Sequence, residues 1–356
     1  MTYQHAPALR ARVLTVRQAA TYYAARSIIY EGQALPLEAI QALIGADMRA
    51  VDRVIRSRLG SDVVLIRQIS EYIIGSGGKR LRPMLVLLSA GLFDYRGTKH
   101  HDLAAIVELI HTATLLHDDV VDESNLRRGR QTANALFGNA ASVLVGDFLY
   151  SRAFQMMVDV GLMRVMAVLS EATNVIAEGE VMQLLNVHDP GIDEDRYLQV
   201  IRYKTAKLFE AATRLGAILG NASASDEQAL SHYGIHLGTA FQLIDDVLDY
   251  SGDNQETGKN VGDDLAEGKP TLPLIYAIQH GNAAQSAVVR HAIEQGGLAD
   301  LKQVVAAIRD TGALDYATQR AREESAAACA AIAHLPHSTY RDCLLQLASF
   351  AVTRNY

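Results

Sequence analysis

Residues 103–130 read LAAIVELIHTATLLHDDVVDESNLRRGR, an apolar run that ends in three aspartates and then in paired arginines. Its apolar residues recur at spacings of three and four, which predicts a helix, because residues three and four apart are neighbours on a helix surface. One stripe of this helix carries His111, Thr114, Leu115, Asp118 and Asp122. An apolar helix face therefore opens into a pair of carboxylates.

The two carboxylates of this stripe need a cation between them. Like charges at i and i+4 disfavour a helix by about 0.2 to 0.5 kcal/mol when solvated, and by far more beside an apolar wall. Ligands that are all oxygen suggest Mg²⁺, which is usually held by one or two carboxylates together with substrate phosphates. The arginines just past the helix end would bind such phosphates. A solvated acidic helix end followed by a basic turn explains this stretch equally well on its own.

A second copy of the pattern decides between these alternatives. Residues 237–253, LGTAFQLIDDVLDYSGD, again lead from apolar residues into Asp245, Asp246 and Asp249. The two DDxxD motifs begin 127 positions apart, at Asp118 and Asp245. Facing each other, two such helices would hold a diphosphate through a metal cluster, whereas each alone would be an electrostatic liability.

Composition predicts a soluble, all-helical protein. The 356 residues include no Trp and 7 Pro, and apolar residues recur at helical spacing almost throughout. The net charge of −7 argues against nucleic acid as a partner. No segment reaches the roughly 18 uninterrupted apolar residues of a membrane span. Cys329 and Cys343 lie in helical patterns without metal spacing, so we expect core thiols in a reducing compartment.

A glycine-rich basic turn joins two predicted helices at residues 75–83, GSGGKRLRP. Its glycines let the backbone come close to a ligand, and three cations surround the turn, which suits an anion site. An ordinary turn between helices with solvated charges is the alternative.

Lysines mark two later stretches. Lys204 lies in RYKTAKLF beside apolar positions. On this stretch alone, the simpler interpretation is a surface lysine whose charged end extends to solvent. Lys259 and Lys269 bracket a polar, glycine-rich loop at residues 251–273. So long a loop inside a compact domain is more often functional than idle.

The two ends of the chain are expected to lack catalytic chemistry. Residues 1–33 form an N-terminal extension in which four arginines precede the first acidic residue, Glu31. A transit peptide has this composition, but a disordered extension or a start codon assigned too far upstream is favoured. Residues 34–356 are expected to form one domain. Its helices beyond Thr271 are interpreted as packing and dimer support.

Five separated motifs occur in a fixed order: GGKRLRP, HDDVVDESNLRRG, KT, FQLIDDVLDYSGD and GKNVGDDLAEGKPTLPL. In this order they resemble the trans-polyprenyl diphosphate synthases, and among them the bacterial octaprenyl diphosphate synthases that make quinone side chains. The resemblance covers residues 34–356, and neither aspartate motif departs from the family pattern.

The resemblance implies a fold, an assembly and a reaction. The implied fold is a single all-α bundle of the isoprenoid synthase type around a central cavity. The implied assembly is a cytoplasmic homodimer, which would contact a membrane only through its product. An allylic diphosphate, with farnesyl diphosphate as the expected primer, loses diphosphate, and the double bond of isopentenyl diphosphate attacks the allylic cation. Proton loss completes each cycle. The expected product is a C40 chain for ubiquinone biosynthesis; a C15–C20 chain or a different long chain is the alternative.

The resemblance also assigns roles by motif position. Three Mg²⁺ ions are expected at Asp118, Asp122 and Asp245, which form the catalytic set together with Lys204. Contacts with isopentenyl diphosphate are expected from Lys79, Arg82, His111 and Arg128. Contacts with the allylic diphosphate are expected from Arg127, Lys204, Thr205, Gln242, Lys259 and Lys269. The remaining carboxylates should orient these groups: Asp119, Asp246 and Asp249.

Product length is expected to depend on small side chains upstream of Asp118. Family synthases with short products typically carry bulky aromatics four or five positions before the first aspartate, where this chain has Thr114 and Ala113. Ala113 should lie about 7.5 Å deeper along the helix than Asp118, given a rise of about 1.5 Å per residue. The tunnel should then stay open down to a floor at Met157 and Leu169. The alternative is that Ala113 merely permits close helix packing.

Two other functions compete with this interpretation. His117 beside Asp118 resembles the HD phosphohydrolases, in which His and Asp ligate metals for hydrolysis, but that reading leaves the second aspartate motif unexplained. A non-catalytic partner subunit of a heteromeric prenyl synthase would be expected to lose carboxylates from one motif, whereas this chain keeps both.

Overall fold

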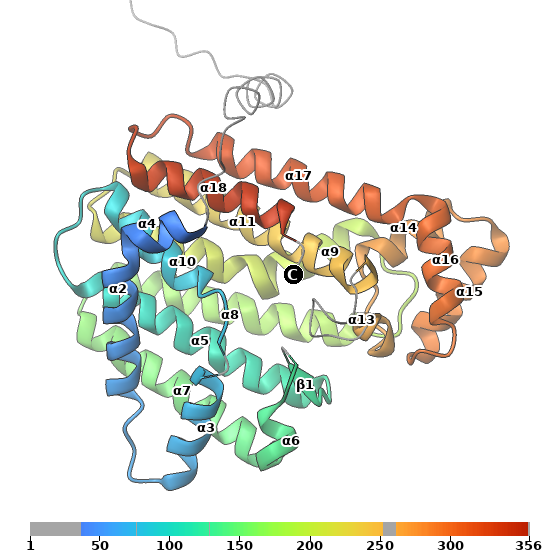
Figure 1. The fold of residues 1–356 in the computed structure, drawn as a ribbon, viewed down its shortest axis with the longest axis horizontal. Coiled ribbons are helices and arrows are strands. Elements are labelled where there is room, and N and C mark those ends of the chain that lie inside the picture. The colour runs from blue at the N-terminus through green and yellow to red at the C-terminus, as the bar shows by residue number, and fades with distance from the viewer. Residues whose placement is uncertain (1–36, 76, 128, 252–260, 355–356) are drawn as a thin grey trace, which may run out of the picture.

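The computed structural model describes residues 37–75, 77–127, 129–251 and 261–354. The predicted extension and the predicted contacts Arg128 and Lys259 lie outside the described residues. The described chain is helical apart from two short antiparallel strands, β1 (Leu126–Arg127) and β2 (Arg130–Gln131), and this confirms the all-α prediction (Figure 1).

Long helices form the body of the bundle (Figure 1). They are α4 (Leu81–Leu92), α5 (Lys99–Val121), α7 (Asn139–Val160), α8 (Met163–Asn186), α10 (Lys207–Leu219), α11 (Ala224–Ser251) and α17 (Ala313–Ala331). α5 packs against α7 and α4, and α10 packs against both α4 and α11. α17 lies along α11 on its other side. The two aspartate motifs are thus carried on two different helices, α5 and α11.

Further elements surround this body. They are α2 (Leu37–Arg58), α3 (Val64–Gly75), α6 (Ala133–Phe137), α9 (Glu194–Ile201), η1 (Arg202–Ala206), α13 (Asp263–Ala266), α14 (Leu272–His280), α15 (Ala283–Gln295), α16 (Leu301–Thr311) and α18 (Thr339–Thr353). The helices α14, α15 and α16 gather at one end of the molecule (Figure 1), where they bury a second apolar cluster together with residues of α11, α13 and α17.

The main apolar core joins helices from α2 to α18. Fully burying one of its Leu or Ile side chains contributes about 1.5 to 3 kcal/mol, so the core supports a rigid cavity wall. Cys329 and Cys343 are thiols buried in this core, as predicted. Burial raises the pKa of the Cys329 thiol to about 12. Among the described residues, no helix is long and apolar enough to cross a bilayer.

Candidate active site

The two aspartate motifs face one cavity of about 580 Å³. All five residues of the predicted stripe on α5 line it: His111, Thr114, Leu115, Asp118 and Asp122. From α11, Phe241, Gln242 and Asp245 line the same cavity. Pockets of about 300 to 1,000 Å³ are typical of small-molecule sites. The predicted juxtaposition of the two motifs is therefore present.

Each of the three predicted metal ligands has a cationic partner. Nζ of Lys269 lies 2.8 Å from Oδ2 of Asp122, and Nζ of Lys204 lies 3.7 Å from Oδ2 of Asp118. The third carboxylate, Asp245, is 2.7 Å from Nη2 of Arg354. The first carboxylate pair needs cationic charge nearby, and Lys204 and Lys269 supply it from distant parts of the chain.

Arg354 follows the last helix, α18, and lines the cavity. Its side chain is only 3% exposed, and Nη2 also donates to the carbonyl oxygen of Phe241 at 2.6 Å. Its guanidinium lies 3.7 Å from the centre of the Phe241 ring. The expectation that no residue beyond Thr271 takes part in the site is therefore wrong for this arginine, whereas dimer support by the later helices stays a prediction.

Lys204 and Thr205 lie in a π-helical turn, η1, between α9 and α10. Such wide turns inside α-helices are frequent at functional sites. The neighbouring helices approach η1 through glycines: a Cβ on Gly179 of α8 would lie 2.5 Å from the backbone nitrogen of Lys204. A Cβ on Gly238 of α11 would lie 2.5 Å from Cα of Ala206. Glycine at both positions allows α8 and α11 to pack closely against this turn, which lies at the cavity.

Glu180 on α8 completes a charged cluster that the motifs did not reveal. It lines the cavity, and its Oε2 lies 2.6 Å from Nζ of Lys204. Burial, opposed by Lys204 and reinforced by Asp118, raises the pKa of Glu180 to about 7. Burial alone would lower the pKa of Lys204, but Asp118 and Glu180 outweigh it, so the pKa of Lys204 is raised and the lysine stays charged.

The remaining aspartates of the motifs are held by protein groups. Asp119 is buried, and its Oδ1 accepts from Nη2 of Arg127 at 2.7 Å and from Nε at 2.8 Å. Asp246 is also buried; it accepts hydrogen bonds from the Tyr197 hydroxyl and, at 2.8 Å, from Nε2 of Gln242. Burial, followed by the charge of Asp264, raises the pKa of Asp246 to about 8. These contacts suit carboxylates that orient neighbouring groups.

A hydrogen-bonded chain leads from Asp246 to the predicted allylic contacts. Gln242 links it to Thr205, whose hydroxyl donates to Oε1 of Gln242 at 3.1 Å. Buried polar networks of this kind fix side-chain orientation when their members are satisfied. Thr205 and Gln242 therefore present defined polar atoms to the cavity.

Three of the predicted isopentenyl diphosphate contacts lie at the same cavity. Lys79, Arg82 and His111 all line it, and Nη1 of Arg82 lies 3.1 Å from Nε2 of His111. Gly77 and Gly78, with φ of 78° and 137°, form the turn that brings these cations to α4. Both φ values lie where glycine alone is unstrained. The basic turn is thus built as predicted.

The predicted chain-length residues divide into two groups. Thr114 lines the cavity. The other three, Ala113, Met157 and Leu169, are buried in the main core beyond the cavity wall. A tunnel that continues past Thr114 toward them stays a prediction.

His117 points away from the cavity. Its Nε2 lies 3.3 Å from Oδ1 of Asp147 and 3.3 Å from the carbonyl oxygen of Val143, both on α7. His117 and Asp118 therefore face different surroundings and do not converge on one metal site, which argues against the HD phosphohydrolase reading.

Solved structures of known proteins share this fold. A polyprenyl synthase from Caulobacter crescentus, complexed with calcium and isoprenyl diphosphate, superposes with a TM-score of 0.88 at 43% identity, covering 91% of this chain and 100% of that chain. A decaprenyl diphosphate synthase from Rhodobacter capsulatus superposes with a TM-score of 0.85 at 47% identity, covering 90% and 100%. The fold is therefore that of the all-helical isoprenoid synthases.

Sequence comparison gives the family. The polyprenyl synthetase model matches residues 63–309. The octaprenyl diphosphate synthase of Escherichia coli is 55% identical over 320 residues, which are 90% of this chain and 99% of that protein. The all-trans-nonaprenyl-diphosphate synthase of Rhodobacter capsulatus is 48% identical over 316 residues, covering 88% and 97%. The chain belongs to the polyprenyl synthetase family, which confirms the resemblance drawn from the five motifs.

Proposed function

We propose that the protein is a trans-prenyltransferase that extends an allylic diphosphate with isopentenyl diphosphate units to a C40 polyprenyl diphosphate. The observation that carries this proposal is the pair of complete aspartate motifs, on α5 and α11, facing one cavity lined with cations. The octaprenyl diphosphate synthase of Escherichia coli, at 55% identity, supports the product class. A different long chain is the alternative, since other relatives are named for nonaprenyl and decaprenyl products.

The carboxylates of Asp118, Asp122 and Asp245 would hold three Mg²⁺ ions. Their donor set is all oxygen and lines one cavity, which fits Mg²⁺ better than a softer metal. When bound, the ions neutralise charge that develops on the departing diphosphate. Lys204 and Lys269 lie beside these carboxylates and bind the same diphosphate from the protein side.

The apolar part of the cavity protects the allylic cation. Leu115, Ile176, Leu208 and Phe241 line it beside the charged groups. They exclude water, which would otherwise capture the cation and release an alcohol. Lys79, Arg82 and His111 orient isopentenyl diphosphate so that its double bond faces the cation. Departing diphosphate takes the proton, so no side chain is assigned as the base.

A homodimer is supported by an apolar surface on α7 and α8. Its side chains are well exposed to solvent: Leu144, Val158, Met163, Val181, Leu184 and Leu185. Exposed apolar side chains gathered on two helices suit a protein interface. We infer that two copies of the chain pair through this surface in the cytoplasm, and that the product is used for ubiquinone.

The deciding experiment uses purified protein, farnesyl diphosphate, labelled isopentenyl diphosphate and Mg²⁺. We expect release of diphosphate, a requirement for both substrates and a C40 product on chromatography. A protein that releases phosphate or monophosphate from one substrate alone would be a hydrolase, and the proposal would be wrong.

A further inference from the structure

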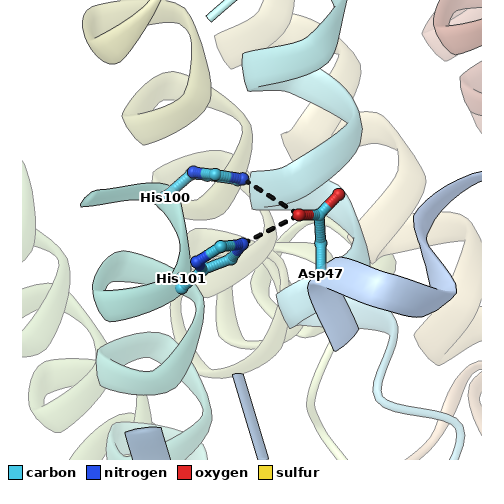
Figure 2. A group of neighbouring side chains, drawn as sticks. All are labelled: Asp47, His100 and His101. Carbon is cyan, nitrogen blue, oxygen red and sulfur yellow. Dashed lines mark hydrogen bonds and ion pairs between the residues drawn. The ribbon is translucent and has the colours of Figure 1, made fainter. Parts of the chain in front are cut away.

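Three potential metal ligands converge at the end of α5 opposite the aspartate motif. His100 and His101 lie in its first turn, and Asp47 lies on α2, which packs against α5. Figure 2 shows both imidazoles directed at the carboxylate of Asp47. The cluster is about 27 Å along the helix from Asp118, at about 1.5 Å per residue. It is therefore separate from the diphosphate cavity.

The distances within the cluster suit a small divalent metal. Nε2 of His101 lies 2.8 Å from Oδ1 of Asp47, and Nε2 of His100 lies 3.5 Å from the same oxygen. Zinc bonds to nitrogen and oxygen are about 2.0 to 2.2 Å, which places tetrahedral ligand atoms roughly 3.3 to 3.6 Å apart. The His100 distance lies within this range, and the His101 distance is shorter because these atoms form a hydrogen bond, so the side chains would rotate apart to admit an ion.

The surroundings hold the two rings in place and leave one side open. The imidazole side chains are 12% and 17% exposed, whereas that of Asp47 is 37% exposed. The Tyr95 ring packs edge to face on His100, with centroids 5.4 Å apart. The open side at Asp47 gives room for water as a further ligand.

The kind of metal follows from the donor atoms. Two imidazole nitrogens and one carboxylate oxygen suit zinc and its neighbours, whereas Mg²⁺ prefers oxygen alone. We propose that Asp47, His100 and His101 bind one divalent transition-metal ion of the zinc class, distinct from the Mg²⁺ ions of the diphosphate site. The bound ion joins α2 to the first turn of the helix that carries Asp118 and Asp122.

The first test measures Zn²⁺ binding by competition with a chromophoric chelator in excess Mg²⁺. We expect wild-type protein to bind one more Zn²⁺ per chain than Asp47→Ala, His100→Ala or His101→Ala, or to bind it more than about tenfold more tightly. The matched control is His291→Ala, which removes an exposed histidine of α15 and should keep wild-type binding. Equal stoichiometry and affinity in all five proteins would overturn the proposal.

A second test needs no variant and so does not depend on the variants folding. Wild-type protein is treated with diethyl pyrocarbonate with and without Zn²⁺, and modified histidines are located by mass spectrometry. Zn²⁺ should protect His100 and His101 but not His291. It should also raise the melting temperature of wild-type protein, since a ligand that binds the folded state stabilises it. Unchanged modification of both histidines would show that no ion binds there.

Discussion

Nζ of Lys269 donates to Oδ2 of Asp122 at 2.8 Å across 147 positions of sequence. This contact ties the segment between α13 and α14 to the end of α5. Burial alone would lower the pKa of Lys269, but Asp122 and Glu267 outweigh it, so its pKa is raised and the lysine stays charged. A carboxylate offers about four lone-pair sites, so Asp122 can ligate an ion while it holds this lysine. The lysine is therefore positioned where metal and diphosphate would meet.

The first prediction is that turnover requires both aspartate motifs and a divalent cation. Replacing Asp118, Asp122 or Asp245 by Ala should lower kcat by several orders of magnitude, because each change removes charge stabilisation of the leaving diphosphate. Helical circular dichroism should be unchanged. The matched control is Asp52→Ala, at an exposed position on α2. Wild-type turnover in excess chelator would contradict the metal assignment.

The second prediction separates the two diphosphate sites. Lys79→Ala, Arg82→Ala and His111→Ala should each raise KM for isopentenyl diphosphate by about ten- to a hundredfold, since a hydrogen bond to a charged group contributes about 1.5 to 3 kcal/mol. Lys204→Ala should act mainly on KM for the allylic substrate. Steady-state kinetics with each substrate varied in turn measures both constants.

The contact between Arg82 and His111 provides an internal check. Their side chains lie 3.1 Å apart, so the double variant should lose less than the sum of the two single losses. Equal shifts in both KM values for all four single variants would show that the division into two sites is wrong.

The third prediction concerns pH and Glu180. Its folded pKa of about 7 lies above the ordinary 4.5, so the folded protein holds a proton here that the unfolded chain has released between pH 4.5 and 7. The bound proton on Glu180 therefore adds to the free energy of unfolding at low pH, and this added stability is lost as the pH rises through 7. Glu180→Gln mimics the protonated form, so it should stabilise the protein at pH 8 relative to wild type more than at pH 5.

Urea unfolding at pH 5 and pH 8, without substrates, measures this difference. Glu178→Gln is the matched control, because Glu178 is an exposed carboxylate on the same helix, α8. A Glu180→Gln stability change that is the same at both pH values would show that Glu180 titrates normally.

Sequence could predict the parts of the site that depend on local spacing. The stripe from His111 to Asp122 is one helix face, and the 3.6-residue period fixes it whatever the tertiary structure. The succession of helices also follows from this period, and the turn at residues 75–83 follows from its glycines, which are local features of the sequence as well. The sequence also predicts that the two motifs face each other, because the carboxylates of each motif repel one another unless cations shared with the other motif neutralise them.

Local spacing does not predict which side chains from distant helices meet in the folded protein. Arg354 reaches Asp245 only because α18 folds back toward the cavity, and no motif surrounds it. Glu180 is an ordinary helical glutamate until Lys204 is placed beside it by the π-helical turn. The depth of Ala113 relative to the cavity likewise depends on how α5 packs against its neighbours, which spacing along one helix does not determine.

The fourth prediction is that residues 1–33 are not needed for catalysis. Every motif lies beyond them, and the first described helix begins at Leu37. Deletion of residues 1–33 should leave kcat and both KM values nearly unchanged. Loss of soluble, active protein after the deletion would show that the extension packs on the domain.

The last prediction concerns product length and compares two neighbouring positions on α5. Thr114 lines the cavity, and Ala113 is fully buried in the core. A phenylalanine at either position would put a ring into the path expected for a growing chain, so Thr114→Phe and Ala113→Phe should both shorten the product to about C15 or C20 while condensation continues. Overpacking at Ala113 should also cost about 1 to 3 kcal/mol of stability, because that position is fully buried in the main core. Product length is read by chromatography and stability by urea unfolding. If both variants fold, turn over and still make the wild-type product, the chain does not grow along this face of α5, and Ala113 serves only close helix packing.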